Sequence, residues 1–159
     1  MMGTRTRATD VMCRVTSDFE LLSFEATEFT AEEAATKLNL PLNMLFKTLL
    51  VKGEKKGYVL AVVPSDHHLS LKKLADAIGD KRVEMAPIEE LTRLTGYLKG
   101  GVSPLGTRRA MPVVLDFSAF QHARISLSAG QRGLQMLVAP SHLQQAAKAQ
   151  VADISDDQS

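Results

Sequence analysis

Lys47 is the residue whose surroundings most suggest chemistry. It stands between Phe46 and the run 48–51 (Thr-Leu-Leu-Val), in a segment with the character of a β-strand. Lysine is rarely fully buried, because removing an ammonium from water costs several kcal/mol unless the charge is paired. Either the side chain extends along the surface to reach water, or it lines a polar pocket where it could bind a phosphate or hydroxyl. The residue types alone leave both interpretations open.

Residues 100–106 form the second unusual segment, with three glycines and one proline in seven positions. Such a backbone can turn its amides inward and bind an anion or a carbonyl oxygen. The segment lacks the Gly-Lys-Ser/Thr of a phosphate P-loop and the Gly-x-Gly-x-x-Gly of a dinucleotide site. A tight structural loop is the alternative, and the shorter segment 130–133 has the same two interpretations.

The familiar catalytic sets fit poorly. His67, His68, His122 and His142 lack the spacing of a metal site, so no metal and no cofactor are predicted. The run 65–67 (Ser-Asp-His) is not a triad, because a triad is assembled in space; it predicts a turn followed by polar loop residues. Cys13 lies near the apolar face of an expected helix, which favours a buried structural thiol over a nucleophile.

Hydrophobic periodicity, caps and turn residues predict the elements that must position these residues. Helices are expected at 6–17, 31–38, 71–78, 87–95 and from 140 onward. Thr30 and Glu33 read as a capping box for the second helix, with Asn39 as its left-handed C-cap. Strands are expected at 19–26, 46–51, 58–64, 83–85, 111–116, 124–128 and 134–138.

The order of these elements predicts the fold class. Strands come in antiparallel-looking pairs, and helices are inserted between groups of strands instead of alternating strictly with them. The prediction is therefore an α/β (α+β) fold with a mixed, mainly antiparallel β-sheet flanked by helices. We expect one domain over 1–159, ending in a polar tail from about residue 153.

Composition narrows the class of protein. The chain has 159 residues, of which 45% are hydrophobic and 23% charged, as in ordinary globular proteins. Its apolar runs fall short of the ~20 residues of a membrane span, and its single cysteine cannot form an internal disulfide, so a cytoplasmic location is predicted. The net charge of +1 argues against a strongly basic protein that coats nucleic acid.

The charges are nevertheless segregated along the chain. Residues 18–33 hold six acids and no base, whereas residues 46–109 hold twelve bases and seven acids, an excess of five bases. This distribution permits one positive face that could steer a polyanion, although solvated helix surfaces would explain it equally well.

Four strings, taken in order along the chain, resemble the YbaK/EbsC family of aminoacyl-tRNA deacylases, related to the editing domain of bacterial prolyl-tRNA synthetases. They are 46–51 (Phe-Lys-Thr-Leu-Leu-Val), 71–74 (Leu-Lys-Lys-Leu), 95–106 (Thr-Gly-Tyr-Leu-Lys-Gly-Gly-Val-Ser-Pro-Leu-Gly) and 130–134 (Gly-x-Arg-Gly-Leu). The likeness covers roughly residues 6–152, and the Gly-Gly-Val-Ser-Pro-Leu-Gly block is its specific part. It implies a mixed sheet wrapped by helices and, in the most similar branch, deacylation of Cys-tRNA(Pro).

The resemblance also implies roles for individual residues. Lys47 becomes the central active-site lysine, and the amides of Gly100 and Gly101 become candidates for stabilising an oxyanion. The expected substrate-binding residues are Phe24, Phe29, Thr48, Ser103, Pro104, Ser128 and Gly130. In this branch no protein nucleophile acts, because the thiol of the substrate attacks its own ester. The implied partners are the acceptor end of a mischarged tRNA and a prolyl-tRNA synthetase, without cofactor or metal.

Three positions depart from the family pattern. Phe24 stands where tyrosine is frequent, Ala129 replaces a glycine, and Gln135 replaces an aspartate. These changes leave Lys47 and the 100–106 loop intact, so they bear on amino-acid specificity more than on deacylation. The alternatives are a deacylase of Ala-, Ser- or Thr-charged tRNA that uses water, a catalytically silent RNA- or nucleotide-binding module, and a protein-interaction subunit of a synthetase.

Overall fold

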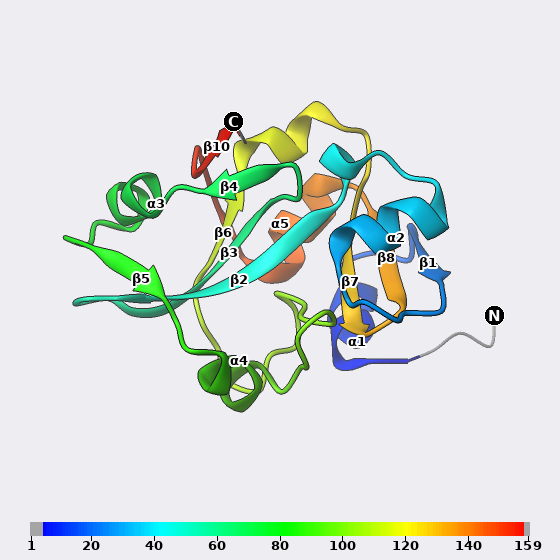
Figure 1. The fold of residues 1–159 in the computed structure, drawn as a ribbon, viewed down its shortest axis with the longest axis horizontal. Coiled ribbons are helices and arrows are strands. Elements are labelled where there is room, and N and C mark those ends of the chain that lie inside the picture. The colour runs from blue at the N-terminus through cyan, green and yellow to red at the C-terminus, as the bar shows by residue number, and fades with distance from the viewer. Residues whose placement is uncertain (1–4, 158–159) are drawn as a thin grey trace.

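The computed structural model describes residues 5–157 and shows a mixed, mainly antiparallel α/β fold (Figure 1). The largest sheet has the order β5-β2-β3-β6-β9, in which β2 is antiparallel to β3 and β5 and the other neighbours are parallel. Its strands are β2 (Phe46–Gly53), β3 (Gly57–Pro64), β5 (Val83–Met85), β6 (Val113–Asp116) and β9 (Gln150–Ala152).

Two smaller antiparallel sheets complete the set in the described part of the chain. One has the order β1-β8-β7, with β1 (Phe19–Ser23), β7 (Ile125–Gln131) and β8 (Leu134–Val138). The other pairs β4 (His67–Leu69) with β10 (Ser155–Asp157). The predicted fold class is confirmed, with its strands divided among three sheets.

The helices cover these sheets from several sides (Figure 1). They are α1 (Arg7–Cys13), α2 (Ala31–Leu38), α3 (Leu71–Ile78), α4 (Ile88–Thr95) and α5 (Pro140–Ala147), with short 3-10 turns η1 (Leu42–Met44) and η2 (Phe117–Gln121). Ser70 caps α3, and Gly79 ends it in the left-handed conformation that glycine adopts without strain. None of the helices in residues 5–157 is long and apolar enough to cross a bilayer.

Alternating side chains of β2 and β3 divide the core into two clusters, one on each face of the large sheet. Phe46 and Leu50 belong to a cluster that includes Leu127 and Met136 of the three-stranded sheet. Val51 belongs to the opposite cluster, with Val59 and Ala61 of β3 and Leu74 of α3. Neighbouring residues of β2 therefore point to two different environments.

Several boundaries and environments differ from the predictions. The first helix is shorter than 6–17, and Cys13 at its end is exposed, so the prediction of a buried thiol is wrong. The expected polar loop after Ser65 contains β4, and most of the expected polar tail is ordered because β10 pairs with β4. The two ends of the predicted 1–159 domain, residues 1–4 and 158–159, lie outside the described residues.

His67 joins the short β4–β10 sheet to the loop before it. Its Nδ1 lies 2.7 Å from Asp66 Oδ1, and its Nε2 lies 2.9 Å from Asp157 Oδ1. Hydrogen bonding to the Asp66 carboxylate, with a smaller effect of Asp157, raises the pKa of His67 above its ordinary value of 6.5. Protonated His67 therefore holds the C-terminal strand more tightly than the neutral ring does.

We expect the protein to lose stability as the pH rises from 6 to 9. A raised pKa in the folded state stabilises the protein fully below pH 6.5, and that contribution disappears as the pH rises through the folded value. The loss should be at most about 1 kcal/mol, since partly exposed ion pairs are screened. Urea unfolding of the wild type and His67→Gln at both pH values measures it; parallel pH profiles would contradict the assignment.

Candidate functional site

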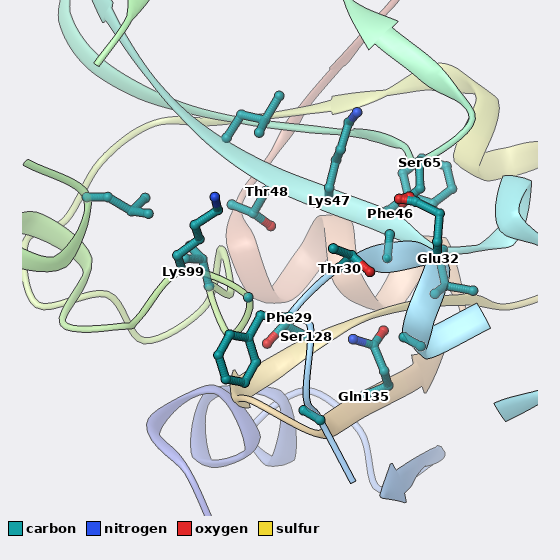
Figure 2. Close-up of a pocket in the computed structure, with 18 of the residues that line it drawn as sticks. Phe29, Thr30, Glu32, Phe46, Lys47, Thr48, Ser65, Lys99, Ser128 and Gln135 are labelled. Carbon is teal, nitrogen blue, oxygen red and sulfur yellow. The ribbon is translucent and has the colours of Figure 1, made fainter. Parts of the chain in front are cut away.

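A cavity of about 550 Å³ opens between the large sheet and the three-stranded sheet (Figure 2). Its walls come from β2, the start of α2, α4, the loop containing Gly100 and the facing strands β7 and β8. Most of the lining is apolar. The uncharged polar side chains among the lining residues are Thr30, Thr48, Ser65, Ser128 and Gln135.

The first half of β2 has a partner strand on one side only. β3 pairs with all of β2, whereas β5 pairs only with residues 51–53. The Ser65 N–H donates to the Leu45 C=O at 2.8 Å, so Leu45 and Ser65 form a hydrogen-bonded pair. In an antiparallel ladder every second residue of β2 then bonds to β3, and the residues between them turn their main-chain groups away. Thr48 therefore turns its main-chain N–H and C=O away from β3, toward the open edge of the strand that borders the cavity.

The side chain of Thr48 adds a third polar group at this edge. Its Oγ1 is buried and has no hydrogen-bond partner in residues 5–157. Figure 2 places Thr48 on the same side of β2 as Ser128 and Gln135, which belong to the facing sheet. Buried polar groups are normally satisfied, so these groups are available to a ligand or to water.

Lys47 leaves β2 on the side opposite Thr48, as expected for consecutive strand residues (Figure 2). It is half-buried and contributes to the cavity lining, which favours the pocket interpretation over a freely extended surface side chain. In the described part of the chain no carboxylate lies within ion-pair distance of its ammonium group. A half-buried cation without a protein partner is suited to bind an anionic group of a ligand.

Ser65 was missed by sequence reasoning, which assigned it to a turn. It follows the end of β3 directly, is 6% exposed and lines the cavity. Its Oγ, like that of Thr48, is buried without a partner in residues 5–157. No local sequence signal could have identified it, because only the pairing of β3 with β2 brings it to this cavity.

The facing sheet contributes polar groups whose orientation is fixed. Gln135 on β8 accepts a hydrogen bond of 2.8 Å at its Oε1 from the hydroxyl of fully buried Ser126. The Oγ of Ser128 on β7 accepts from the Gly130 N–H at 3.1 Å. Gln135, noted in the sequence as a departure from the family, thus brings a neutral amide to a wall where a carboxylate would carry charge.

The loop before α2 is held by the carboxylate of Glu33. The Thr30 hydroxyl accepts from the Glu33 N–H, as predicted, but the Glu33 side chain does not reach back to Thr30 as a capping box requires. It accepts instead from the N–H and hydroxyl of Thr27 and from the N–H groups of Glu28 and Phe29. These bonds, above all the one from the Thr27 hydroxyl, hold the pKa of Glu33 far below its ordinary value.

The predicted site residues fall into two groups. The cavity lining includes six of the ten: Phe24, Phe29, Lys47, Thr48, Gly100 and Ser128. Gly101, Ser103, Pro104 and Gly130 do not belong to its lining.

Gly101 cannot serve as the free oxyanion donor that was expected. Its N–H already donates to the Leu98 C=O at 2.8 Å, and a Cβ there would lie 2.8 Å from the Arg132 nitrogen. Ser103 is fully buried, and its Oγ accepts from the Leu105 N–H at 3.1 Å. These contacts correct the expected substrate-facing roles of both residues.

Pro104 and Gly130 are likewise structural. Pro104 is buried within the loop, and Gly130, with φ of +93°, packs against the ring of Tyr97. The Tyr97 hydroxyl donates to the Leu105 C=O at 2.6 Å, which ties the loop together. Gly100 differs from them because it lines the cavity, and its φ of +89° requires glycine.

The lining limits the chemistry that the protein itself can perform. It contains Lys47, Lys99 and Glu32 as its charged residues, and no histidine, cysteine or tyrosine from residues 5–157. No group of three acidic, histidine or cysteine side chains in that range comes together as a metal site would require. The hydroxyls of Thr48, Ser65 and Ser128 therefore have no histidine beside them in the described lining that could activate them as nucleophiles.

A family model for the aminoacyl-tRNA editing domain matches residues 25–146, which include all the strands and helices that line the cavity. The chain belongs to this family. An Enterococcus faecalis protein named "Putative Cys-tRNA(Pro)/Cys-tRNA(Cys) deacylase EbsC" is 41% identical over 126 residues, 79% of this chain and 77% of that protein.

Two further proteins are similar to this chain. The proline–tRNA ligase of Thermosipho africanus is 35% identical over 88 residues, which cover 55% of this chain and 15% of that longer protein. A crystal structure described as a putative trans-editing enzyme for prolyl-tRNA synthetase superposes with a TM-score of 0.82 at 25% identity, covering 96% of this chain and 99% of that one.

We expect Gly101→Ala to lower stability by about 1–3 kcal/mol, the usual cost of overpacking. The added methyl group would press on the backbone of the β7–β8 turn, which cannot move away as a flexible side chain could. Thermal melts and activity on one preparation measure the effect. An activity loss in a variant that melts like the wild type would contradict this structural role.

Proposed function

We propose that this protein is a trans-editing deacylase that hydrolyses the ester bond of mischarged aminoacyl-tRNA, with Cys-tRNA(Pro) as its substrate. The observation that carries the proposal is the cavity at the open edge of β2, which combines the unpartnered hydroxyl of Thr48 with the ammonium of Lys47 and has no histidine or cysteine in its described lining. The 41% identity to a protein named as a Cys-tRNA(Pro)/Cys-tRNA(Cys) deacylase supports the choice of amino acid and tRNA.

The chemistry then comes from the substrate. The cysteine thiol attacks its own ester carbonyl, a C–S bond forms, the ester C–O bond breaks, and the ribose oxygen leaves with the thiol proton as a hydroxyl. Water then opens the resulting thiolactone to free cysteine. Because both reacting groups belong to one molecule, holding them in the reactive geometry gives the large rate gain of intramolecular reactions.

Within this proposal, Thr48 stabilises the charge that develops on the carbonyl oxygen. Its main-chain N–H at the unpaired edge takes the place of the Gly101 amide, which is engaged within its own loop. A preorganised donor of this type contributes about 3–4 kcal/mol of transition-state stabilisation. Lys47 binds a phosphate or hydroxyl of the terminal nucleotide at the rim, and Lys99 adds positive charge there.

Lys47→Ala should lower deacylation by about 100-fold or more while leaving the fold intact, because the ammonium has no protein partner to lose. Lys47→Arg should restore little, since a planar guanidinium does not replace a compact charge. Single-turnover assays and thermal melts measure both.

Lys52→Ala is the matched control, because Lys52 is an exposed lysine of the same strand that lies outside the cavity, and this variant should keep near-normal rates. Near-normal turnover of Lys47→Ala would remove Lys47 from the site.

The thiol mechanism predicts a difference between two nearly identical substrates. Ser-tRNA(Pro) should react more slowly than Cys-tRNA(Pro) by more than the roughly 10–200-fold that fit alone can provide. A hydroxyl is much less nucleophilic than a partly ionised thiol at neutral pH. Parallel time courses measure both rates.

The exposed Cys13 of the protein serves as the control for that comparison. Cys13→Ser should deacylate Cys-tRNA(Pro) at close to the wild-type rate, because the reacting thiol belongs to the substrate. Equal rates for the two charged tRNAs would overturn the thiol mechanism and favour water and an Ala-, Ser- or Thr-charged substrate. Release of no amino acid from any of them would favour a binding module without catalysis.

A further inference from the structure

Phe29 lies at the point where three segments meet around the mouth of the cavity. The Arg132 guanidinium carbon of the β7–β8 turn lies 3.8 Å from the centroid of the Phe29 ring. Arg132 also donates from Nε to the Lys99 C=O at 2.8 Å, which joins that turn to the glycine loop. On the other side, a Cβ at Gly100 would lie 2.6 Å from the Phe29 Cβ. The ring is thus a fixed part of the rim.

The backbone of Phe29 is in an unfavourable conformation. Its φ is +60°, a value that residues other than glycine seldom adopt, and its side chain is 38% exposed. A bulky residue remains in such a conformation only when its surroundings hold it there, and such strain is concentrated at ligand-binding sites. The hydrogen bonds that hold it come from one side chain.

That side chain is Glu33, which does not line the cavity itself. Its carboxylate, 3% exposed, accepts four hydrogen bonds of 2.6–3.1 Å from residues 27–29, and it also pairs with Lys37 at 3.0 Å. Three of these donors are consecutive main-chain N–H groups. They can converge on one acceptor only if the loop bends as it does here, with Phe29 turned toward Gly100.

We infer that Glu33 is a positioning residue for substrate binding: its carboxylate folds residues 27–29 into a rigid rim and presents the Phe29 ring to the acceptor end of the tRNA. This inference rests on the proposed function, and it adds Glu33 as a residue that acts on the substrate through Phe29. Glutamine cannot replace the carboxylate, because its NH₂ group would face main-chain donors that need an acceptor. The loop would then relax, and Phe29 would leave the left-handed conformation.

The test is Glu33→Gln in single-turnover deacylation of Cys-tRNA(Pro) over a range of protein concentrations. A preformed rim contributes equally to binding of the ground state and the transition state. The half-saturating concentration should therefore rise about tenfold while the maximal rate changes less than about threefold. In a Phe29→Ala background, Glu33→Gln should cause no further rise, because a residue that acts through Phe29 has lost its target.

Asp80→Asn is the matched control. The Asp80 carboxylate also accepts several main-chain N–H groups, those of Lys55, Lys56 and Lys81 at 3.1, 2.8 and 2.7 Å, but it braces the β2–β3 turn away from the cavity. It should lower the melting temperature as Glu33→Gln does, with an unchanged half-saturating concentration. Equal shifts in both variants, or an unchanged value in Glu33→Gln, would overturn the inference.

Amide hydrogen exchange of residues 27–29 tests the role of Glu33 independently of the proposed deacylase activity. Protection of these three amides should be lost in Glu33→Gln and retained in Asp80→Asn, whichever substrate the protein uses. A wild type that releases no amino acid from charged tRNA would overturn the proposed deacylase. Persistent protection in Glu33→Gln would overturn the positioning role even in an active enzyme.

Discussion

The site depends on one constraint, the missing partner along the first half of β2. A strand that is buried on both faces must still satisfy its main-chain groups, and an edge enclosed within the protein leaves them to whatever fills the adjoining space. β5 begins to pair only at Val51, and the 100–106 loop and α2 approach the remaining edge without forming a ladder. The result is a cavity whose polar groups belong to a rigid central strand.

The same geometry fixes the groups that the proposed deacylation uses. The two cores on either side of β2 fix the register of Lys47 and Thr48, so their groups reach opposite sides of one strand at the cavity. Preorganised groups of this type need little rearrangement when charge develops, which is the main source of electrostatic catalysis. The mouth of the site is built differently, because Phe29, Gly100 and Arg132 pack together there from distant parts of the chain.

Local signals in the sequence predicted much of the fold. The hairpin of β2 and β3 followed from two apolar runs around a charged turn, and the limits of α3 followed from Ser70 and Gly79. The β4–β10 pair was missed because its strands are three residues long and 85 or more positions apart, so neither segment carries an alternating pattern of its own. Of the residues that the family resemblance singled out, Lys47, Thr48 and Gly100 line the cavity, whereas the Gly101 N–H and the Ser103 hydroxyl are hydrogen-bonded within the loop.

The sequence by itself determined the longer helices and strands, the fold class and the lysine-and-glycine pattern of the family, since periodicity, caps and motifs are properties of adjacent residues. The short strands β4, β9 and β10 were not predicted. Only the tertiary structure decided which polar groups remain free. Ser65 reaches the cavity only because β3 pairs with β2, and its Oγ stays without a partner there. Glu33 supports the 27–29 loop only because the loop bends so that the Phe29 N–H donates to its carboxylate. Whether a donor or acceptor is free depends on every neighbour that could satisfy it, and those neighbours are brought together only when the chain folds.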